Sequence, residues 1–373
     1  MALPGTERFR QRLGALNPSH FRSVQGLWAS SIGLGTYLGD ADDRTDALYG
    51  EAIRVALSRG CNVLDTAINY RCQRSERIIG RTLAALIHEQ ALSRDEVILC
   101  TKGGYLAFDG TVPADPGRYL IETIFEAGLA SPDDLVAGCH CLAPAYLDHA
   151  LKTSLHNLRV ETIDGYYLHN PEQQLEAVSR ATLLQRLEAA FGLLEQRVQD
   201  GAIRSYGVAT WQGLRANPKA RRYLSLEELA HVATRVGGTS HHFKLLHVPD
   251  NLAMPAAHAF QNQTVRGEPV SVLEAAQRLG LSVVVSASLL QSRLARPVRP
   301  RTTTSHGPRL DDLIPGLATP AQRAIQFVRS TPGVTTALVG MKERAHVEEN
   351  LALAASPMMS AEDIAAVFDR TRR

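Results

Sequence analysis

Short apolar segments alternate with longer segments of helical period along most of the chain, and this alternation constrains the fold more than any other feature. Segments rich in Val, Ile, Leu and Tyr are predicted as strands at 31–35, 62–67, 96–102, 162–169, 203–209, 243–248, 281–288 and 334–340. Their nearly continuous apolar character is typical of parallel strands that are buried on both faces. Helices are predicted at 45–59, 75–90, 144–159, 183–199, 226–236, 271–279, 320–330 and 344–354.

Eight successive strand-then-helix units favour a closed (β/α)8 barrel, or TIM barrel, built as a single domain over residues 1–373. The structural alternative is an open, doubly wound sheet. Such a sheet is expected to carry a Gly-x-Gly-x-x-Gly turn after its first strand, and the sequence GLGTYLGD at this place lacks that spacing.

Two connections are longer than ordinary loops. Residues 103–143 separate the third strand from its helix, and residues 292–318 separate the seventh strand from its helix. Because both connections follow carboxyl ends of barrel strands, we expect them to cover the substrate. The alternative is that they are surface insertions without a role in the site.

Charge and composition argue against several classes of protein. The formal net charge is only +2, so no overall field favours nucleic acid or an anionic membrane. Residues 293–309 are rich in Arg, but their prolines and threonines are typical of a solvated loop. The first residues lack the apolar core of a secretory signal, no segment resembles a membrane span, and the five cysteines are an odd number. We therefore expect a soluble, cytoplasmic protein with reduced thiols.

Four residues with chemically useful side chains follow three consecutive strands. Asp65, Lys102 and His169 lie at the carboxyl ends of the second, third and fourth strands, and Tyr70 follows Asp65 by five residues. Each alone has an ordinary interpretation, such as a helix cap, a buried core histidine or a packed aromatic ring. Barrel enzymes place their reactive groups at these strand ends, so the four together predict an active site.

The chemistry of these four side chains fits the transfer of hydride to a carbonyl group. The oxygen that gains negative charge needs a proton, and Tyr70 is the candidate acid/base. A tyrosine with the ordinary pKa of about 10 is a poor donor near neutrality, so we expect Lys102 to lower that pKa. Asp65 would keep Lys102 charged and oriented, and His169 would polarise the carbonyl oxygen.

The chain also resembles the aldo-keto reductases over residues 31–354. GCNVLDTAINY followed by SERIIG is similar to that family's first signature, with Asp65, Tyr70 and Glu76 in register. CTKGG contains the family's lysine as Lys102, and LKTSLHNLRVETIDGYYLHN matches a family segment that ends on His169. GAIRSYGVATW and TPGVTTALVGMKERAHVEENL are similar to two further family segments. The resemblance implies an NAD(P)-dependent oxidoreductase acting on an aldehyde, ketone or aldose.

The sequence departs from the family where the nicotinamide ring is usually held. Ala209 and Thr210 replace a Ser-Asn pair, and Ala287 replaces an aromatic residue that commonly stacks on the ring. His247 stands where the family usually has glutamine. We expect the missing contacts to come from Asn170, His247 or Asn251.

The resemblance also implies a set of residues that bind the cofactor. NADP is expected in preference to NAD because Lys342 and His346 are cations in the segment that usually meets the 2′-phosphate, although NAD stays an alternative. Glu349 and Asn350 are expected near the adenine. The remaining candidates are Gly35, Thr36, Asp65, Asn170, Thr210, Ser286, Leu289, Gln291 and Gly340.

Tyr105, His140 and Trp211 are the candidate substrate contacts, with Phe108 as a further pocket-lining residue. Cys139, His140 and Cys141 lie close together, but their spacing matches no usual zinc site, so no metal is expected. The substrate is predicted to be a small carbonyl compound or sugar, and carbonyl reduction is favoured over alcohol oxidation. The protein is expected to be a monomer or a small homo-oligomer.

Two other functions stay open at this point. A non-catalytic barrel could bind nicotinamide and report redox state to a partner protein. A metal-dependent lyase or isomerase is the second alternative, but it requires several ligands at the strand ends, where only Asp65, His169 and His247 are available.

Overall fold

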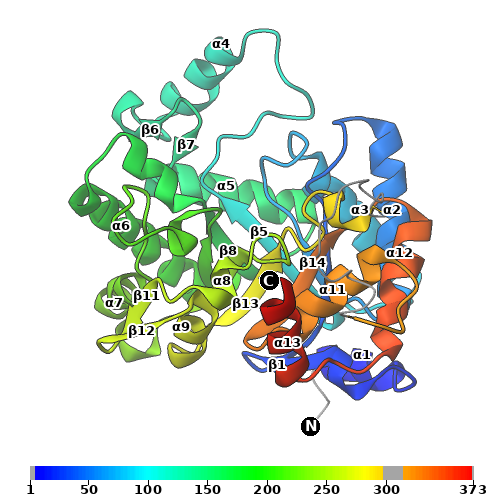
Figure 1. Ribbon diagram of the computed structural model, residues 1–373. Coiled ribbons are helices and arrows are strands. Elements are labelled where there is room, and N and C mark those ends of the chain that lie inside the picture. Colours follow the sequence, from blue (N-terminus) through cyan, green and yellow to red (C-terminus); the bar gives the residue numbers. More distant parts are fainter. Residues whose placement is uncertain (1–4, 297–313, 372–373) are drawn as a thin grey trace, which may run out of the picture.

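The computed structural model describes residues 5–296 and 314–371 of the chain. Eight parallel strands form a closed barrel at its centre, and each strand pairs with its neighbour in sequence until the last meets the first (Figure 1). These strands are β3 (Ile32–Gly35), β4 (Val63–Asp65), β5 (Ile98–Gly103), β8 (Ile163–His169), β9 (Ile203–Ala209), β10 (Phe243–Pro249), β13 (Ser282–Ser286) and β14 (Val334–Gly340). The predicted (β/α)8 barrel is confirmed, and every predicted strand is present.

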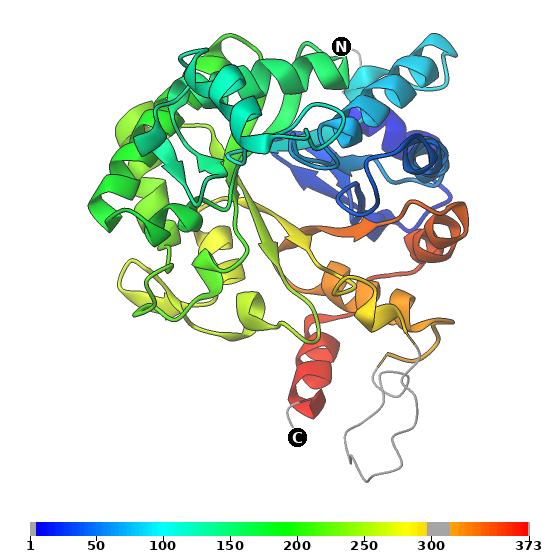
Figure 2. The same cartoon turned by 90° about the horizontal axis from the view of Figure 1, so that it is seen from above.

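Helices surround the barrel, as the view from above shows (Figure 2). The helices that follow the barrel strands are α2 (Asp43–Ser58), α3 (Arg74–His88), α5 (Pro144–Leu158), α6 (Arg180–Gln199), α7 (Leu226–Gly237), α9 (Val272–Arg278), α11 (Pro320–Ser330) and α12 (Arg344–Leu351). Their boundaries follow local signals. The Asp42 carboxylate accepts the Thr45 amide proton at 2.8 Å and caps α2, and Pro320 occupies the first turn of α11.

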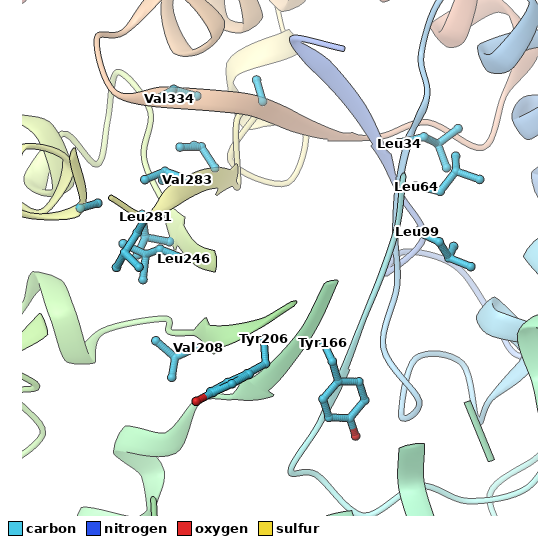
Figure 3. Packing of buried hydrophobic residues seen from close by; sticks show 14 of the residues in the cluster. Leu34, Leu64, Leu99, Tyr166, Tyr206, Val208, Leu246, Leu281, Val283 and Val334 are labelled. Carbon is cyan, nitrogen blue, oxygen red and sulfur yellow. The ribbon is translucent and has the colours of Figure 1, made fainter. Parts of the chain in front are cut away.

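Side chains point alternately outward and inward along each barrel strand, so the core is divided into two layers. Leu64, Leu99 and Tyr166 lie outside the barrel and pack against the helices (Figure 3). Their chain neighbours Val63 and Tyr167 belong to a separate cluster that fills the barrel interior. Burial on both faces explains why these strands read as continuous apolar segments.

Several elements are added to the eight units. Helix α1 (Gly5–Arg12) and the hairpin of β1 (Phe21–Val24) and β2 (Leu27–Ser30) precede the barrel. The hairpin of β11 (Gln263–Val265) and β12 (Glu268–Val270) and the short helix α8 (Ala256–Ala259) follow β10, and α13 (Ala361–Thr371) follows α12. No helix of residues 5–296 and 314–371 has both the length and the apolar character needed to cross a bilayer.

The two long connections differ from simple loops. Segment 103–143 contains α4 (Pro116–Leu120), a π-helical turn at Ile121–Phe125, and a hairpin of β6 (Leu135–Val136) and β7 (His140–Cys141). This internal structure was not predicted, because its elements are too short to show a periodicity. The second connection begins with a 3₁₀ turn at Arg293–Ala295, and residues 297–313 lie outside the described residues.

Candidate active site

A cavity of about 450 Å³ opens at the carboxyl end of the barrel strands. Asp65, Tyr70, Lys102 and His169 all line it, so the fold brings together the four residues that the sequence predicted as catalytic. They come from β4, the loop after β4, β5 and β8, which are consecutive around the barrel. This is the end at which (β/α)8 enzymes hold their active sites.

Lys102 and Asp65 form a buried ion pair in the wall of the cavity. The Lys102 ammonium donates to Asp65 Oδ1 at 2.5 Å and to the Thr66 carbonyl oxygen at 2.6 Å. Burial works to lower the pKa of Lys102, but Asp65 and Tyr70 together raise that pKa above its ordinary value. Lys102 therefore stays an ammonium at neutral pH, fixed by two hydrogen bonds.

The Tyr70 ring lies directly above this pair. The Lys102 nitrogen is 5.0 Å from the centre of the ring, and the rings of Tyr37 and His169 lie edge-on to it at 5.0 and 5.8 Å. Burial raises the pKa of Tyr70 above 10.0, while the Lys102 charge works to lower it. Lys102 therefore acts in the expected direction, but the expected net lowering of the Tyr70 pKa is wrong, because burial outweighs the lysine. Tyr70 carries its proton at neutral pH.

His169 is neutral in this site, and a hydrogen bond from a buried histidine fixes its backbone. Burial lowers the pKa of His169 well below 6.5, and the charge of Lys102 adds to the effect. The carbonyl oxygen of His169 accepts a hydrogen bond from His140 Nε2 at 2.7 Å. The Gln174 amide donates to His140 Nδ1 at 2.7 Å, which fixes the tautomer of that imidazole.

The expected substrate contact by His140 is corrected by this geometry. The His140 side chain is fully buried, both of its ring nitrogens are used, and it does not line the cavity. Tyr105 and Trp211 do line the cavity. Phe108 does not, and its ring packs against Tyr119.

Tyr70 is followed by a strained turn that the sequence did not reveal. Arg71, Cys72 and Gln73 have φ angles of 50°, 53° and 69°, in the left-handed region that residues other than glycine seldom occupy. The Arg71 guanidinium is buried, with 1% of its side chain exposed, and pairs with Asp46 on α2 at 2.6 Å. It also donates to the carbonyl oxygens of Asp40 and Asp42 at 2.7 and 3.1 Å. Arg71 therefore ties the end of the Tyr70 loop to the start of α2.

The predicted cofactor residues fall into two groups. The first group lines the cavity and consists of Gly35, Thr36, Asp65, Asn170, Thr210, Ser286, Leu289, Gln291 and Gly340. The second group lies beyond the rim, after β14. There Lys342 is half-buried and His346 is exposed on α12. Glu349 accepts a hydrogen bond from Thr319 at 2.6 Å, and Asn350 is buried.

Several buried polar atoms on the far side of the cavity have no hydrogen-bond partner among the described residues. They include Thr210 Oγ1, His247 Nδ1 and Ser288 Oγ. Unsatisfied buried polar atoms are rare in folded proteins, so a cluster of them indicates a surface that a polar ligand completes. The cavity is also lined by residues that the sequence did not predict as contacts for the cofactor or substrate, among them Tyr37, Asn69 and Ser288. His247 lines it as well and was predicted only as an alternative contact.

The positions that depart from the family also line the cavity. Ala287 has a left-handed φ of 57°, and its carbonyl oxygen accepts a hydrogen bond from the Asn251 side chain at 2.9 Å. Asn251 itself does not line the cavity, which leaves Asn170 and His247 from the three proposed replacements. Trp211 is 43% exposed, and the Glu172 carboxylate fixes its turn by accepting the Trp211 amide proton at 2.9 Å.

A group of three or more His, Cys, Asp or Glu side chains arranged for a metal ion is not found among the described residues. His140 and Cys141 belong to strand β7, and Cys139 is half-buried with a free thiol.

Comparison with known proteins assigns the chain to a family. The model of the aldo/keto reductase family matches residues 31–228, which is more than half of the chain, so the protein belongs to the aldo/keto reductase family, a family of oxidoreductases. It is 22% identical to the uncharacterized oxidoreductase YqkF of Bacillus subtilis over 353 residues, covering 92% of this chain and 93% of that protein.

Two further matches name a substrate or a bound cofactor. The chain is 30% identical to 6-dehydroglucose reductase of Novosphingobium aromaticivorans over 202 residues, 52% of either protein. An aldo/keto reductase from Klebsiella pneumoniae, solved with NADP and acetate, has a TM-score of 0.59 and 21% identity, with 95% of both chains covered. This structural likeness supports the fold.

Proposed function

We propose that the protein is an NADP-dependent reductase of small carbonyl compounds. The observation that carries the proposal is the position of Tyr70 above the buried Lys102–Asp65 pair and beside the neutral His169. Such an arrangement supplies a proton donor, a fixed positive charge and a hydrogen-bond donor at one place. A carbonyl oxygen that develops negative charge needs all three.

Each residue has a distinct part in this proposal. Tyr70 gives its hydroxyl proton to the substrate oxygen, and the Lys102 charge stabilises the tyrosinate that remains. Asp65 holds Lys102 in place and keeps it charged. Neutral His169 donates one hydrogen bond to the same oxygen and orients the substrate.

The residues around the cavity fit a nicotinamide dinucleotide. Buried Thr210, Ser288 and His247 offer polar atoms that have no hydrogen-bond partner in the described part of the chain, as a carboxamide and ribose would require. When bound, the nicotinamide supplies or accepts the hydride. The Klebsiella relative solved with NADP supports this choice of cofactor.

A preference for NADP over NAD rests on charges beyond the rim. Lys342 is the second residue after β14 and is half-buried, and among the described residues its ion-pair partner is the neighbouring Glu343 at 3.4 Å. A weak pair of this kind leaves the ammonium available for a 2′-phosphate. His346 on the exposed side of α12 is the second candidate cation.

The proposal is tested by following NADPH oxidation spectroscopically with a panel of aldehydes, ketones and aldoses, using Tyr70→Phe and Tyr37→Phe as a matched pair. Both tyrosines line the cavity and their rings touch, but Tyr70 alone lies over Lys102. We expect Tyr70→Phe to lower kcat by roughly 10²–10⁴-fold, with Tyr37→Phe keeping most of the rate.

Full activity of Tyr70→Phe would refute the assignment of the acid. If NADPH bound tightly and no carbonyl compound were reduced by the wild type, a non-catalytic redox sensor would be the better interpretation.

A further inference from the structure

A second cavity lies at the opposite end of the barrel. It has a volume of about 610 Å³, within the range of small-molecule sites. Its apolar walls include Val63, Ile98 and Val284 from the barrel interior, and Val24 and Leu27 of the β1–β2 hairpin also line it. Barrel interiors are normally filled by layers of side chains, so a hollow of this size at the amino ends of the strands calls for an explanation.

Two register shifts bring extra polar side chains to this cavity. Phe243 and Leu245 on β10 pair with consecutive residues of β9, so Lys244 is an additional residue in the strand. Thr335 is the additional residue on β14 in the same way. Both of these residues line the cavity. Register shifts re-aim side chains, and here they add a cation and a hydroxyl to one opening.

The register shift on β10 depends on a glycine in the neighbouring strand β9. A Cβ atom at Gly207 on β9 would lie 1.8 Å from the carbonyl oxygen of Leu245. Only glycine therefore allows β10 to approach β9 with Lys244 displaced.

Within residues 5–296 and 314–371, one cation at the opening has no ion-pair partner. Asp164 accepts from both Arg94 and Arg204 at 2.8 Å. His242 is paired with Glu195 at 2.8 Å. Lys244 is in no ion pair that the described part of the chain shows. Arg204, Lys244 and Asp164 together give the opening a net positive charge.

A second polar group lies deeper in the cavity. Tyr167 lines it and is fully buried, and among the described residues its hydroxyl has no partner beyond a weak contact with the thiol of Cys100, which lines the same cavity. Tyr167 pairs in register with Gly207, which pairs with Leu245, so Tyr167 is two strands away from β10. Two inter-strand spacings amount to about 10 Å. Because the two residues stand on strands that far apart, we expect a ligand that contacts both Lys244 and Tyr167 to carry its polar groups several bonds apart.

We propose that this cavity binds a carboxylate with a compact apolar body and a second oxygen at its far end. The carboxylate would meet Lys244 and Thr335 at the opening, the apolar body would contact Val63 and Val284, and the second oxygen would bond to Tyr167. Hydroxyaryl carboxylates have this shape and charge. The Tyr167 ring packs at 5.6 Å against His247, which lines the other cavity, so these two rings separate the two sites.

The test is calorimetric titration of the full-length protein with 4-hydroxycinnamate and with cinnamate, which differ by one hydroxyl. We expect saturable binding of one 4-hydroxycinnamate per chain, about fivefold tighter than that of cinnamate. Tyr167→Phe should remove this difference. Lys244→Met should weaken both ligands about tenfold or more, because it removes a charge-assisted hydrogen bond.

Two control variants locate the binding. Lys219→Met removes an exposed lysine elsewhere on the surface and should leave both affinities unchanged. Trp211→Ala changes the other cavity and should also leave them unchanged. The proposal would be overturned if the wild type showed no saturable binding, or if Lys244→Met bound both ligands as tightly as the wild type does. Loss of binding in Trp211→Ala would also overturn it.

Discussion

The two sides of the candidate active site differ in how their side chains are held. On the side formed by β4, β5 and β8, Lys102 donates to Asp65 and to a backbone carbonyl, and His140 fixes the backbone of His169. On the side formed by β9, β10 and the end of β13, Thr210, His247 and Ser288 have polar atoms without partners among the described residues. Hydrogen bonds therefore hold Lys102 and the His169 backbone on the first side, although Asp65 Oδ2 and His169 Nδ1 also lack partners there among the described residues, whereas no such bond holds the three side chains named on the second side.

This difference has a consequence for catalysis. Groups that stabilise developing charge work best when they are oriented before the substrate arrives, because no reorganisation is then needed during the reaction. Cofactor contacts have no such requirement, since the bound cofactor itself satisfies them. Substitutions on the first side should therefore lower kcat, and substitutions near the cofactor should mainly raise KM.

The largest effect is expected for Lys102→Met. Loss of the ammonium removes the charge that stabilises the Tyr70 anion and leaves Asp65 buried without its partner. We expect kcat for carbonyl reduction to fall roughly a thousandfold. In the oxidation direction, where Tyr70 acts as a base, kcat should rise with pH toward a pKa above 10.0, because burial raises the Tyr70 pKa.

The sign of the pH effect separates this interpretation from simple misfolding. The Lys102 charge works to lower the Tyr70 pKa, so its removal should move the rise in oxidation rate to still higher pH. Lys102→Arg keeps the charge and should move this rise much less. A rise displaced to lower pH in Lys102→Met would contradict the proposed electrostatic role.

An intermediate effect is expected when the turn after Tyr70 is released. Arg71→Ala removes a buried guanidinium that joins the loop to Asp46 and to two backbone carbonyls. We expect kcat to fall roughly 30-fold, because small displacements of a catalytic group are costly, with little change in the KM for NADPH. Unfolding free energy should drop by about 2 kcal/mol, as measured by urea denaturation.

Arg81→Ala is the matched control for this substitution. Arg81 contacts the same Asp46 carboxylate at 3.0 Å, but its side chain is 52% exposed and it belongs to α3 rather than to the turn after Tyr70. Its loss should change kcat less than twofold. Equal losses of kcat in the two variants would show that Asp46, rather than the turn, controls the position of Tyr70.

Most of the barrel and the catalytic side could be predicted because both follow from local sequence. Each strand is a short apolar segment, and Asp65, Lys102 and His169 stand at strand ends, where the fold itself determines their meeting. The sign of the Tyr70 pKa shift was missed, because Lys102 is visible in the sequence whereas the burial that outweighs it is not.

The supporting contacts were missed for a different reason. Arg71 and Asp46 are 25 positions apart, and nothing in their sequence neighbourhoods distinguishes them from solvated surface charges. His140 was selected as a substrate contact because it lies in the long third connection, but β6 and β7 direct it toward the back of His169. The register shifts at Lys244 and Thr335 depend on inter-strand pairing, which a single sequence does not reveal.

The smallest effect is expected on the cofactor side, at Lys342. Lys342→Ala removes an accessible ammonium that would contact the 2′-phosphate. This loss should cost about 1.5 kcal/mol, or roughly a tenfold rise in the KM for NADPH. The KM for NADH and the kcat values with both cofactors should stay unchanged. Arg344→Ala is a suitable control because Arg344 already pairs with Glu51 and Glu348, so it has less charge to offer a phosphate. Equal use of the two cofactors by the wild type would refute the preference for NADP. If the wild type preferred NADPH and Lys342→Ala kept that preference, the exposed His346 would be the cation to test next.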